Sequence, residues 1–224
     1  MALPADLLSA ALATIPPRRR LVVGVSGGVD SMLLLDCVRD HVSRNPVARD
    51  AIARAGVDAR AGVDSRLPVL AVHVHHGLNP HADDWAGHVE QACAEAGIDC
   101  VVKRVAVARN VASREAAARS ARYAAFHEVL QPGDALLLAH HADDQAETFL
   151  LRLLRGSGLS GLGAMRAARL ENAVPDCWLL RPLLDLPRST IEAEAVRRGL
   201  RWVEDPSNAD PSIDRNLLRH EVLP

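Results

Sequence analysis

The sequence predicts an α/β fold: a doubly wound, mainly parallel sheet with helices on both faces. Two observations predict it. Short and nearly continuous apolar runs, typical of strands covered on both faces, alternate along the chain with longer stretches of helical spacing. This alternation is the pattern of βαβ units, and in such sheets ligands bind at the carboxyl ends of the strands.

The runs expected to form strands are rich in Val, Leu and Ala. They span Leu21 to Val25, Val69 to Val74, Cys100 to Val105 and Ala135 to Ala139. The third run is the most polar, because it contains Lys103 and Arg104.

Helices are expected between and after these strands, where apolar residues recur every three or four positions. The predicted spans are Asp30 to His41, His81 to Ala96, Ser113 to Leu130 and Asp143 to Arg155, followed by a short helix from Pro187 to Arg198 and an apolar helical segment from Leu217 to Leu223.

The chain of 224 residues is expected to form one main domain with additions at both ends. Residues 1–19 are predicted as an N-terminal helix, residues 20–185 as the main domain, and residues 186–224 as a helical extension or the start of a following domain. Residues 43–68 interrupt the alternation with a polar stretch that contains the hexamer ARAGVD twice. Two copies are too few for a repeat architecture, so an inserted surface loop is predicted.

Charge and cysteine usage narrow the class of protein. The 26 basic and 28 acidic residues give a net charge of −2, so a nucleic-acid partner would have to be held by local patches. The cysteines Cys37, Cys93, Cys100 and Cys177 form no CxxC pair, which favours free thiols in a reducing compartment. Because no apolar run approaches the roughly 18 residues of a membrane span, a cytoplasmic protein with no membrane partner is expected.

A glycine loop joins the first strand to the first long helix. It reads Ser26-Gly27-Gly28-Val29-Asp30-Ser31. The glycines let backbone amides approach an anion, the serine hydroxyls can donate, and the helix N-terminus adds free N–H groups and partial positive charge. The Lys-Ser/Thr ending of a Walker A loop is missing. Asp30 suits such a site where Mg²⁺ bridges it to phosphates; the alternative is a tight turn with a capping Asp.

Further polar strings stand near the ends of the later strands and in the elements that follow. They are HVHHGL at 73–78, Glu115 with Ala118-Arg119 and Arg122-Tyr123, AHHADDQAET at 139–148, RGSG at 155–158, RPLL at 181–184, EDPSN at 204–208 and RNLLR at 215–219. Together with the glycine loop, and in this order, they resemble the tRNA(Ile)-lysidine synthetases, a family of the PP-loop (N-type ATP pyrophosphatase) superfamily. The resemblance covers about residues 20–224, apart from the 43–68 insertion.

The resemblance implies an adenine nucleotide α hydrolase-like, Rossmann-like fold and a ligase activity. ATP, with Mg²⁺, would adenylate the C2 oxygen of cytidine 34 in an isoleucine tRNA with a CAU anticodon. The ε-amine of free L-lysine would then displace AMP and form lysidine. Residues 20–185 would be the PP-loop catalytic domain, and a homodimer is a further expectation because relatives commonly form dimers.

The expected nucleotide site combines the glycine loop with the end of the second strand. Its loop residues are Ser26, Gly27, Gly28, Val29, Asp30 and Ser31. Asp30 is expected to hold Mg²⁺ through the phosphates and is counted as catalytic, and the resemblance implies that His75 and His76 contact the nucleotide. A zinc site at His73, His75 and His76 is disfavoured, because no further Cys or His stands at zinc spacing.

The string after the fourth strand supplies the candidate lysine site. Asp143, Asp144 and Glu147 fall in the first turns of one predicted helix, where acids could hold the ammonium groups of lysine or a metal ion. Asp143 or Asp144 is the candidate for orienting the substrate or acting as a base, and Glu147, His140 and His141 are expected to contact lysine or tRNA. The alternative is that these acids only complement the helix dipole.

Arginine supplies nearly all the positive charge, since Lys103 is the only lysine. Guanidinium groups bind phosphate and carboxylate in bidentate geometry. The family strings place Arg181 and Arg219 among the expected catalytic residues. Contacts to lysine or tRNA are expected from Arg119, Arg122, Arg155 and Arg215. The alternative for such arginines is an ordinary solvated surface.

Other functions share some of these features. Cytidine thiolases of the same superfamily use paired cysteines, which the spacings here do not offer, and the amide synthetases lack the HHADDQAET and DPSN strings. A non-catalytic or tRNA-binding-deficient nucleotide-binding fragment is the alternative from a different class. The early end at residue 224 favours a fragment, whereas the intact glycine loop counts against loss of catalysis.

Overall fold

The computed structural model describes residues 4–44, 67–107, 114–154, 156, 163–206 and 214–223. Within these ranges a six-stranded sheet has the order β3-β2-β1-β4-β6-β5. Neighbouring strands are parallel except for β5, which is antiparallel to β6. The predicted doubly wound, mainly parallel α/β fold is confirmed, and the antiparallel edge strand is an addition that the sequence analysis did not foresee.

The predicted strands are all present, with ends displaced by one or two residues. The six strands are β1 (Arg20–Gly24), β2 (Val69–His75), β3 (Asp99–Arg104), β4 (Asp134–Leu137), β5 (Ala168–Leu170) and β6 (Trp178–Leu180). In β1, Leu21 and Val23 contribute to one apolar cluster and Val22 to the other, as expected for a strand covered on both faces.

Helices follow the strands in the expected places. Their bounds are α1 (Pro4–Ala13), α2 (Val29–Arg44), α4 (Ala82–Ala96), α5 (Arg114–Val129), α6 (Ala142–Leu154), α7 (Arg188–Arg197), α8 (Asp214–Leu217) and a π-helical turn η2 (Leu218–Val222). The predicted helix start at Ser113 and most of the 43–68 insertion lie outside the described residues. Among the helices that are described, none is both long and apolar enough to cross a membrane.

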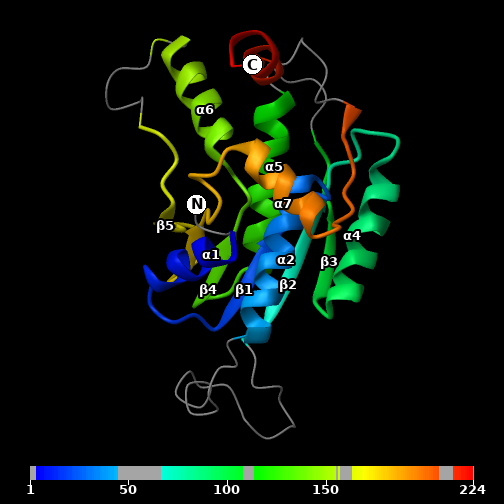
Figure 1. Cartoon of the computed structure of the whole chain (residues 1–224), viewed down its shortest axis with the longest axis vertical. Helices are drawn as coiled ribbons and strands as arrows, with labels where there is room; N and C mark the ends of the chain where they lie inside the picture. Colours follow the sequence, from blue (N-terminus) through cyan, green and yellow to red (C-terminus); the bar gives the residue numbers. More distant parts are fainter. Residues whose placement is uncertain are drawn as a thin grey trace, which may run out of the picture.

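The helices cover the sheet in two layers (Figure 1). α1, α2 and α7 lie in front of the sheet in this view, and their side chains Leu8, Leu34 and Ile191 are fully buried in one cluster with the strands. α5 lies behind the sheet, where Phe126 packs with Val22 in the second cluster. The two terminal segments therefore share the apolar core of the main domain, while the predicted division into 1–19, 20–185 and 186–224 stays a prediction.

An ionic cluster fastens α7 to α2. The Arg198 guanidinium donates to Asp36 at 2.7 Å, to Asp40 at 3.1 Å and to Glu194 at 2.7 Å, with the Arg198 side chain 12% exposed. Hydrogen bonds from Arg197 and then Arg198 lower the pKa of the Glu194 carboxyl to about 2. Because these charges are mutually paired, the cluster fixes the C-terminal end of α7 relative to α2.

Candidate functional site

The candidate site lies at the carboxyl ends of β1 and β4, which are neighbours in the sheet. Three helices start there: α2 after β1, α6 after β4, and α7 beside α6. Each start contributes backbone N–H groups without helical partners and partial positive charge, a setting that suits an anionic ligand.

The glycine loop is organised around the hydroxyl of Ser31. Its Oγ accepts from the amides of Ser26 at 3.1 Å and Gly27 at 3.2 Å, and it donates to the carbonyl of Gly28 at 2.9 Å. The hydroxyls of Ser26 and Ser31 are 3.1 Å apart. Ser31 is buried whereas Ser26 is exposed, so Ser31 shapes the loop and Ser26 faces the space above it.

Gly27 is the position of the loop that requires glycine. Its φ is +95°, and a Cβ there would come within 3.0 Å of Val203 and 3.3 Å of Val89. The amide of Val203 also donates to the carbonyl of Gly27 at 2.9 Å. Both the conformation and the close approach of the neighbouring segment therefore exclude a larger residue.

Asp30 stands at the start of α2 with a side chain that is 27% exposed. Its Oδ1 atom is buried and has no hydrogen-bond partner among the described residues, and it lies 3.8 Å from Nε2 of His141. Burial raises the pKa of the Asp30 carboxyl, while the charges of His141 and Arg188 oppose that rise.

These features of Asp30 fit a hard cation, which prefers carboxylate oxygen and would relieve the buried oxygen. Among the described residues no group of three or more His, Cys, Asp or Glu side chains could hold a metal ion. A cation at Asp30 would thus need further oxygen ligands from a bound phosphate.

Asp143 and Asp144 each cap a different helix. Asp144 accepts from the His141 amide at 3.1 Å, the reciprocal half of a capping box at the start of α6. Asp143 accepts from the Arg188 amide at 2.7 Å and so caps α7. Both carboxylates also flank the His141 ring, at 3.3 Å for Asp143 and 3.6 Å for Asp144.

Arg188 is a site residue that the sequence analysis missed. Its amide binds Asp143, and its guanidinium bonds to Glu192 at 2.8 Å. Burial disfavours the charge on Arg188, but the Glu192 hydrogen bond and the nearby Asp30 carboxylate outweigh it and raise the guanidinium pKa. The sequence signal was present but faint: an Arg directly after Pro187 at a predicted helix start.

Glu147 is buried and paired with an arginine of the C-terminal segment. Its side chain is 1% exposed, and Oε1 accepts from Nε and Nη2 of Arg219 at 2.8 and 2.6 Å. The pair ties α6 to the C-terminal η2 turn. Two residues predicted for substrate contact and catalysis are therefore bonded to each other, an arrangement that favours a positioning role for both.

Arg181 is likewise committed to a neighbour. It is 4% exposed, and its Nε donates to Nδ1 of His140 at 3.1 Å while Nη1 donates to the carbonyl of Arg166 at 2.7 Å. Burial lowers the pKa of His140 to about 3, so its ring is neutral at physiological pH with Nδ1 as an acceptor. The structure thus gives Arg181 a contact that orients His140.

His76, Arg119 and Arg122 are brought close to the same edge. Burial lowers the pKa of His76 to about 4, and the charge of Arg122 adds to that shift. The exposed Arg119 stacks over the ring of Tyr123 at 5.1 Å. Both arginines also lower the pKa of His140, which places them within electrostatic reach of the site.

The structure gives His75 two charged neighbours, and its predicted contact with the nucleotide stays a prediction. It is buried, and its Nε2 lies 3.2 Å from Asp83 and 3.4 Å from Arg104, on the side of β2 toward β3. Arg155 and the side chain of Arg215 lie outside the described part of the chain. Their predicted contacts stay predictions.

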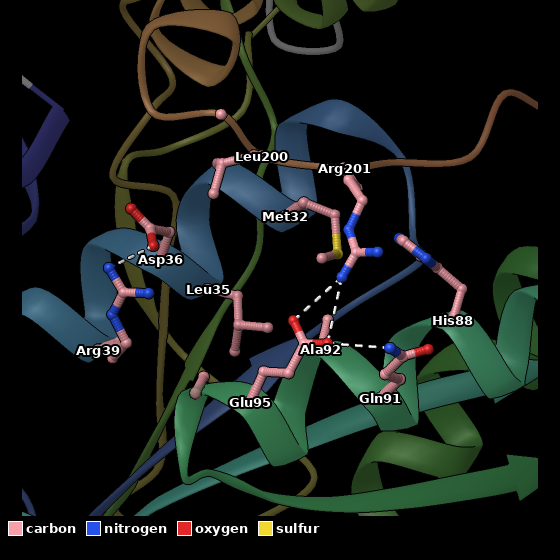
Figure 2. A pocket seen from close by; sticks show the side chains of 12 residues that line it. Met32, Leu35, Asp36, Arg39, His88, Gln91, Ala92, Glu95, Leu200 and Arg201 are labelled. Carbon is pink, nitrogen blue, oxygen red and sulfur yellow. Dashed lines mark hydrogen bonds and ion pairs between the residues drawn. The ribbon is translucent and has the colours of Figure 1, made fainter.

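A separate cavity of about 230 Å³ lies between α2 and α4. Figure 2 shows its walls, where Arg39 is bonded to Asp36 and Arg201 to Glu95. None of the described residues that line it is a predicted site residue. Since its charged groups are already paired, the chemistry of this fold is better sought at the strand ends.

Comparison with known proteins adds independent findings. Residues 6–224 match the family model of the PP-loop domain. The chain is 48% identical over 220 residues to a tRNA(Ile)-lysidine synthase of Alkalilimnicola ehrlichii, covering 98% of this chain and 44% of the relative. A synthase of the same name from Xanthomonas campestris pv. campestris is 46% identical, with 98% and 46% covered. The chain thus spans less than half the length of these curated relatives.

Solved structures share the fold at low sequence identity. A U34-tRNA thiolase from Methanococcus maripaludis has a TM-score of 0.63 at 16% identity, covering 91% of this chain and 65% of the thiolase. An NMN synthetase from Francisella tularensis has a TM-score of 0.51 at 13% identity, with 89% and 72% covered. These likenesses concern the arrangement of helices and strands.

Proposed function

The chain belongs to the PP-loop domain family, and we propose from this premise that it is the catalytic part of a tRNA(Ile)-lysidine synthase. The reaction is the ATP-dependent ligation of free L-lysine to C2 of cytidine 34 in an isoleucine tRNA with a CAU anticodon. Relatives of that name, 41–48% identical over 92–98% of the chain, support the assignment.

The observation that carries the proposal is the approach of Asp30 to His141. It brings the glycine loop and the HHADDQAET string together at adjacent strand ends, where Oδ1 of Asp30 lies 3.8 Å from Nε2 of His141. One string would hold the phosphates of ATP and the other would orient lysine. A ligase of this kind requires the two substrates side by side.

For the first half-reaction, the amides of the glycine loop and the exposed hydroxyl of Ser26 would bind the pyrophosphate part of ATP. Asp30 would hold Mg²⁺ together with the phosphates, and the ion would stabilise charge that develops as pyrophosphate leaves. Arg188 supplies a further fixed cation beside Asp30.

For the second half-reaction, the acids at the start of α6 would bind and orient lysine. Asp143 is the more exposed of the two, with a side chain 47% exposed against 15% for Asp144, which favours Asp143 as the group that meets the ammonium or accepts its proton. Asp144 and Arg181 would hold His141 and His140 in place.

For the tRNA, the exposed Arg119 and Arg122 next to the site are the described residues best placed to meet phosphate. We propose that selection of the CAU anticodon is a property of the whole protein, of which this chain corresponds to less than half the length in the curated relatives. Cytoplasmic location and a homodimer are proposed on the sequence resemblance alone.

A thiolase is the less supported alternative. Burial raises the pKa of Cys37 to about 12 and that of Cys177 to about 11, so neither is a ready thiolate. The hydrogen bond between Cys93 and Cys100 lowers the pKa of Cys100 and raises that of Cys93, so this pair is the one to replace in a test of the thiolase alternative. A nucleotide-binding fragment without lysine transfer is the alternative from another class.

Labelled lysine, Mg-ATP and a tRNA transcript with C34 provide the direct test, with a U34 transcript and Asp30→Ala as controls. The proposal expects lysine incorporation with C34 alone and its loss in Asp30→Ala. Absence of incorporation, with no lysine- and tRNA-dependent AMP formation even after the C-terminal part of a relative is supplied, would contradict it.

A further inference from the structure

Two carbonyl groups, that of Val25 just before the glycine loop and that of Gly27 within it, are held by distant parts of the protein. The Val25 carbonyl lies 2.9 Å from Nδ1 of His73, at the middle of β2. The Gly27 carbonyl accepts at 2.9 Å from the amide of Val203, in the segment after α7. A carbonyl only accepts, so the His73 ring must donate its Nδ1 proton here.

The direction of a carbonyl determines that of the next amide, because the C=O and N–H of a trans peptide unit point to opposite sides. Holding the Val25 carbonyl turns the Ser26 N–H toward the hydroxyl of Ser31. Holding the Gly27 carbonyl turns the Gly28 N–H away from Val203 in the same manner. In both cases a carbonyl oxygen, which would repel a bound anion, is held by a donor elsewhere in the protein.

We infer that His73 and Val203 are positioning residues that set the peptide orientations of the glycine loop from two sides. As a statement about ATP binding, this inference rests on the proposed function.

The surroundings of both residues suit this role. His73 is 4% exposed, and burial lowers its pKa, so the ring is neutral and the carbonyl is its fixed partner. The segment of Val203 is anchored a second time, since Asn79 donates to Asp205 at 3.3 Å. A methyl group at Gly27 would come within 3.0 Å of Val203, so the segment lies directly against the loop.

The test compares His73→Leu, which fills the space without a donor, with His73→Asn, whose side-chain amide can replace the Nδ1–H. Two quantities are measured on the full chain: the affinity for a non-hydrolysable ATP analogue with Mg²⁺, and amide hydrogen exchange in the peptide of residues 25–31. His41→Leu is the matched control, because it removes an imidazole contact to Ser9, 3.0 Å long, at the opposite end of α2.

His73→Leu is expected to weaken binding of the ATP analogue about tenfold and to speed amide hydrogen exchange in the loop about tenfold. Each change corresponds to the loss of one hydrogen bond. His73→Asn should recover most of both, and His41→Leu should change neither. Val203→Pro removes the amide that donates to the Gly27 carbonyl and should have the same effects as His73→Leu. It serves as the test if His73→Leu does not fold.

Unchanged loop exchange in His73→Leu or Val203→Pro, or equal effects of His73→Leu and His73→Asn, would overturn the inference. Wild-type protein that does not bind the analogue would contradict the proposed function instead, and loop exchange would still decide the positioning role.

Discussion

Nε2 of His141 lies 3.8 Å from Oδ1 of Asp30, although the two residues follow different strands of the sheet. β1 and β4 are parallel neighbours, so the helices that follow them start side by side. The buried Asp30 oxygen has no hydrogen-bond partner among the described residues, and the imidazole is close without bonding to it. This gap between the two strings is where we expect a cation and the reacting groups of both substrates to meet.

Replacing Asp30 by Asn is expected to abolish activity and to stabilise the protein. Burial raises the pKa of Asp30, so the folded chain holds its proton more tightly than the unfolded chain, and ionisation opposes folding. That destabilisation is absent below the ordinary pKa of 3.8 and grows as pH rises through the raised value. Tm of Asp30→Asn should therefore exceed that of the wild type at pH 7, with the difference shrinking on acidification, while lysine transfer falls about 100-fold or more. A lower Tm at pH 7 would contradict this account.

Arg188→Ala is expected to lower kcat/KM for ATP by about 10- to 100-fold, since it removes a cation next to Asp30. The backbone amide of residue 188 is kept, so Asp143 can still cap α7. Arg197→Ala is the matched control, because that side chain is on the same helix, 63% exposed and paired with Glu194. Steady-state kinetics with varied ATP measures the effect. Equal losses in both variants would indicate a general effect on α7.

Arg219→Ala is expected to lower the free energy of unfolding by about 2–3 kcal/mol, because it removes a cation bonded to the buried carboxylate of Glu147. In a Glu147→Gln background the same change should cost less, with a coupling of about 1–3 kcal/mol. Urea denaturation of the four proteins measures this. Additive effects would mean that the pair contributes no specific interaction.

Gly27→Ala is expected to cost about 1–3 kcal/mol of stability, because φ of +95° is unfavourable for alanine and the new methyl group meets Val203. Val203→Ala should relieve the contact but not the backbone strain, so the double variant recovers part of the loss. Thermal unfolding of both variants checks this prediction. Full recovery would show that crowding by Val203 is the whole effect.

The sequence predicted the positions of β1 to β4 because a buried parallel strand consists of a short run of apolar residues, which can be recognised locally. The strand order was not predicted, because alternation alone does not say which strands are neighbours; the pairing of β1 with β4 brings the glycine loop and the HHADDQAET string together. The three-residue strands β5 and β6 were not predicted, since their runs are too short and their pairing depends on tertiary contacts.

The roles of single side chains were less predictable, because they depend on partners far away in the sequence. Glu147 reads as a site acid until Arg219 is seen to neutralise it. Arg188 carries no motif, and its place beside Asp30 follows from how α7 packs on α2. Residue type and spacing indicate which side chains could take part in a site, whereas the residues that they contact depend on the tertiary structure.

The hydrogen bond from Val203 to Gly27 bears on how the protein is made. On the ribosome the glycine loop leaves the exit tunnel long before the segment that contains Val203. The phosphate loop is therefore expected to acquire its final shape only near the end of translation of this domain. Nascent chains arrested before residue 203 should gain no protection from proteolysis with ATP, whereas chains arrested far enough downstream to expose that segment should.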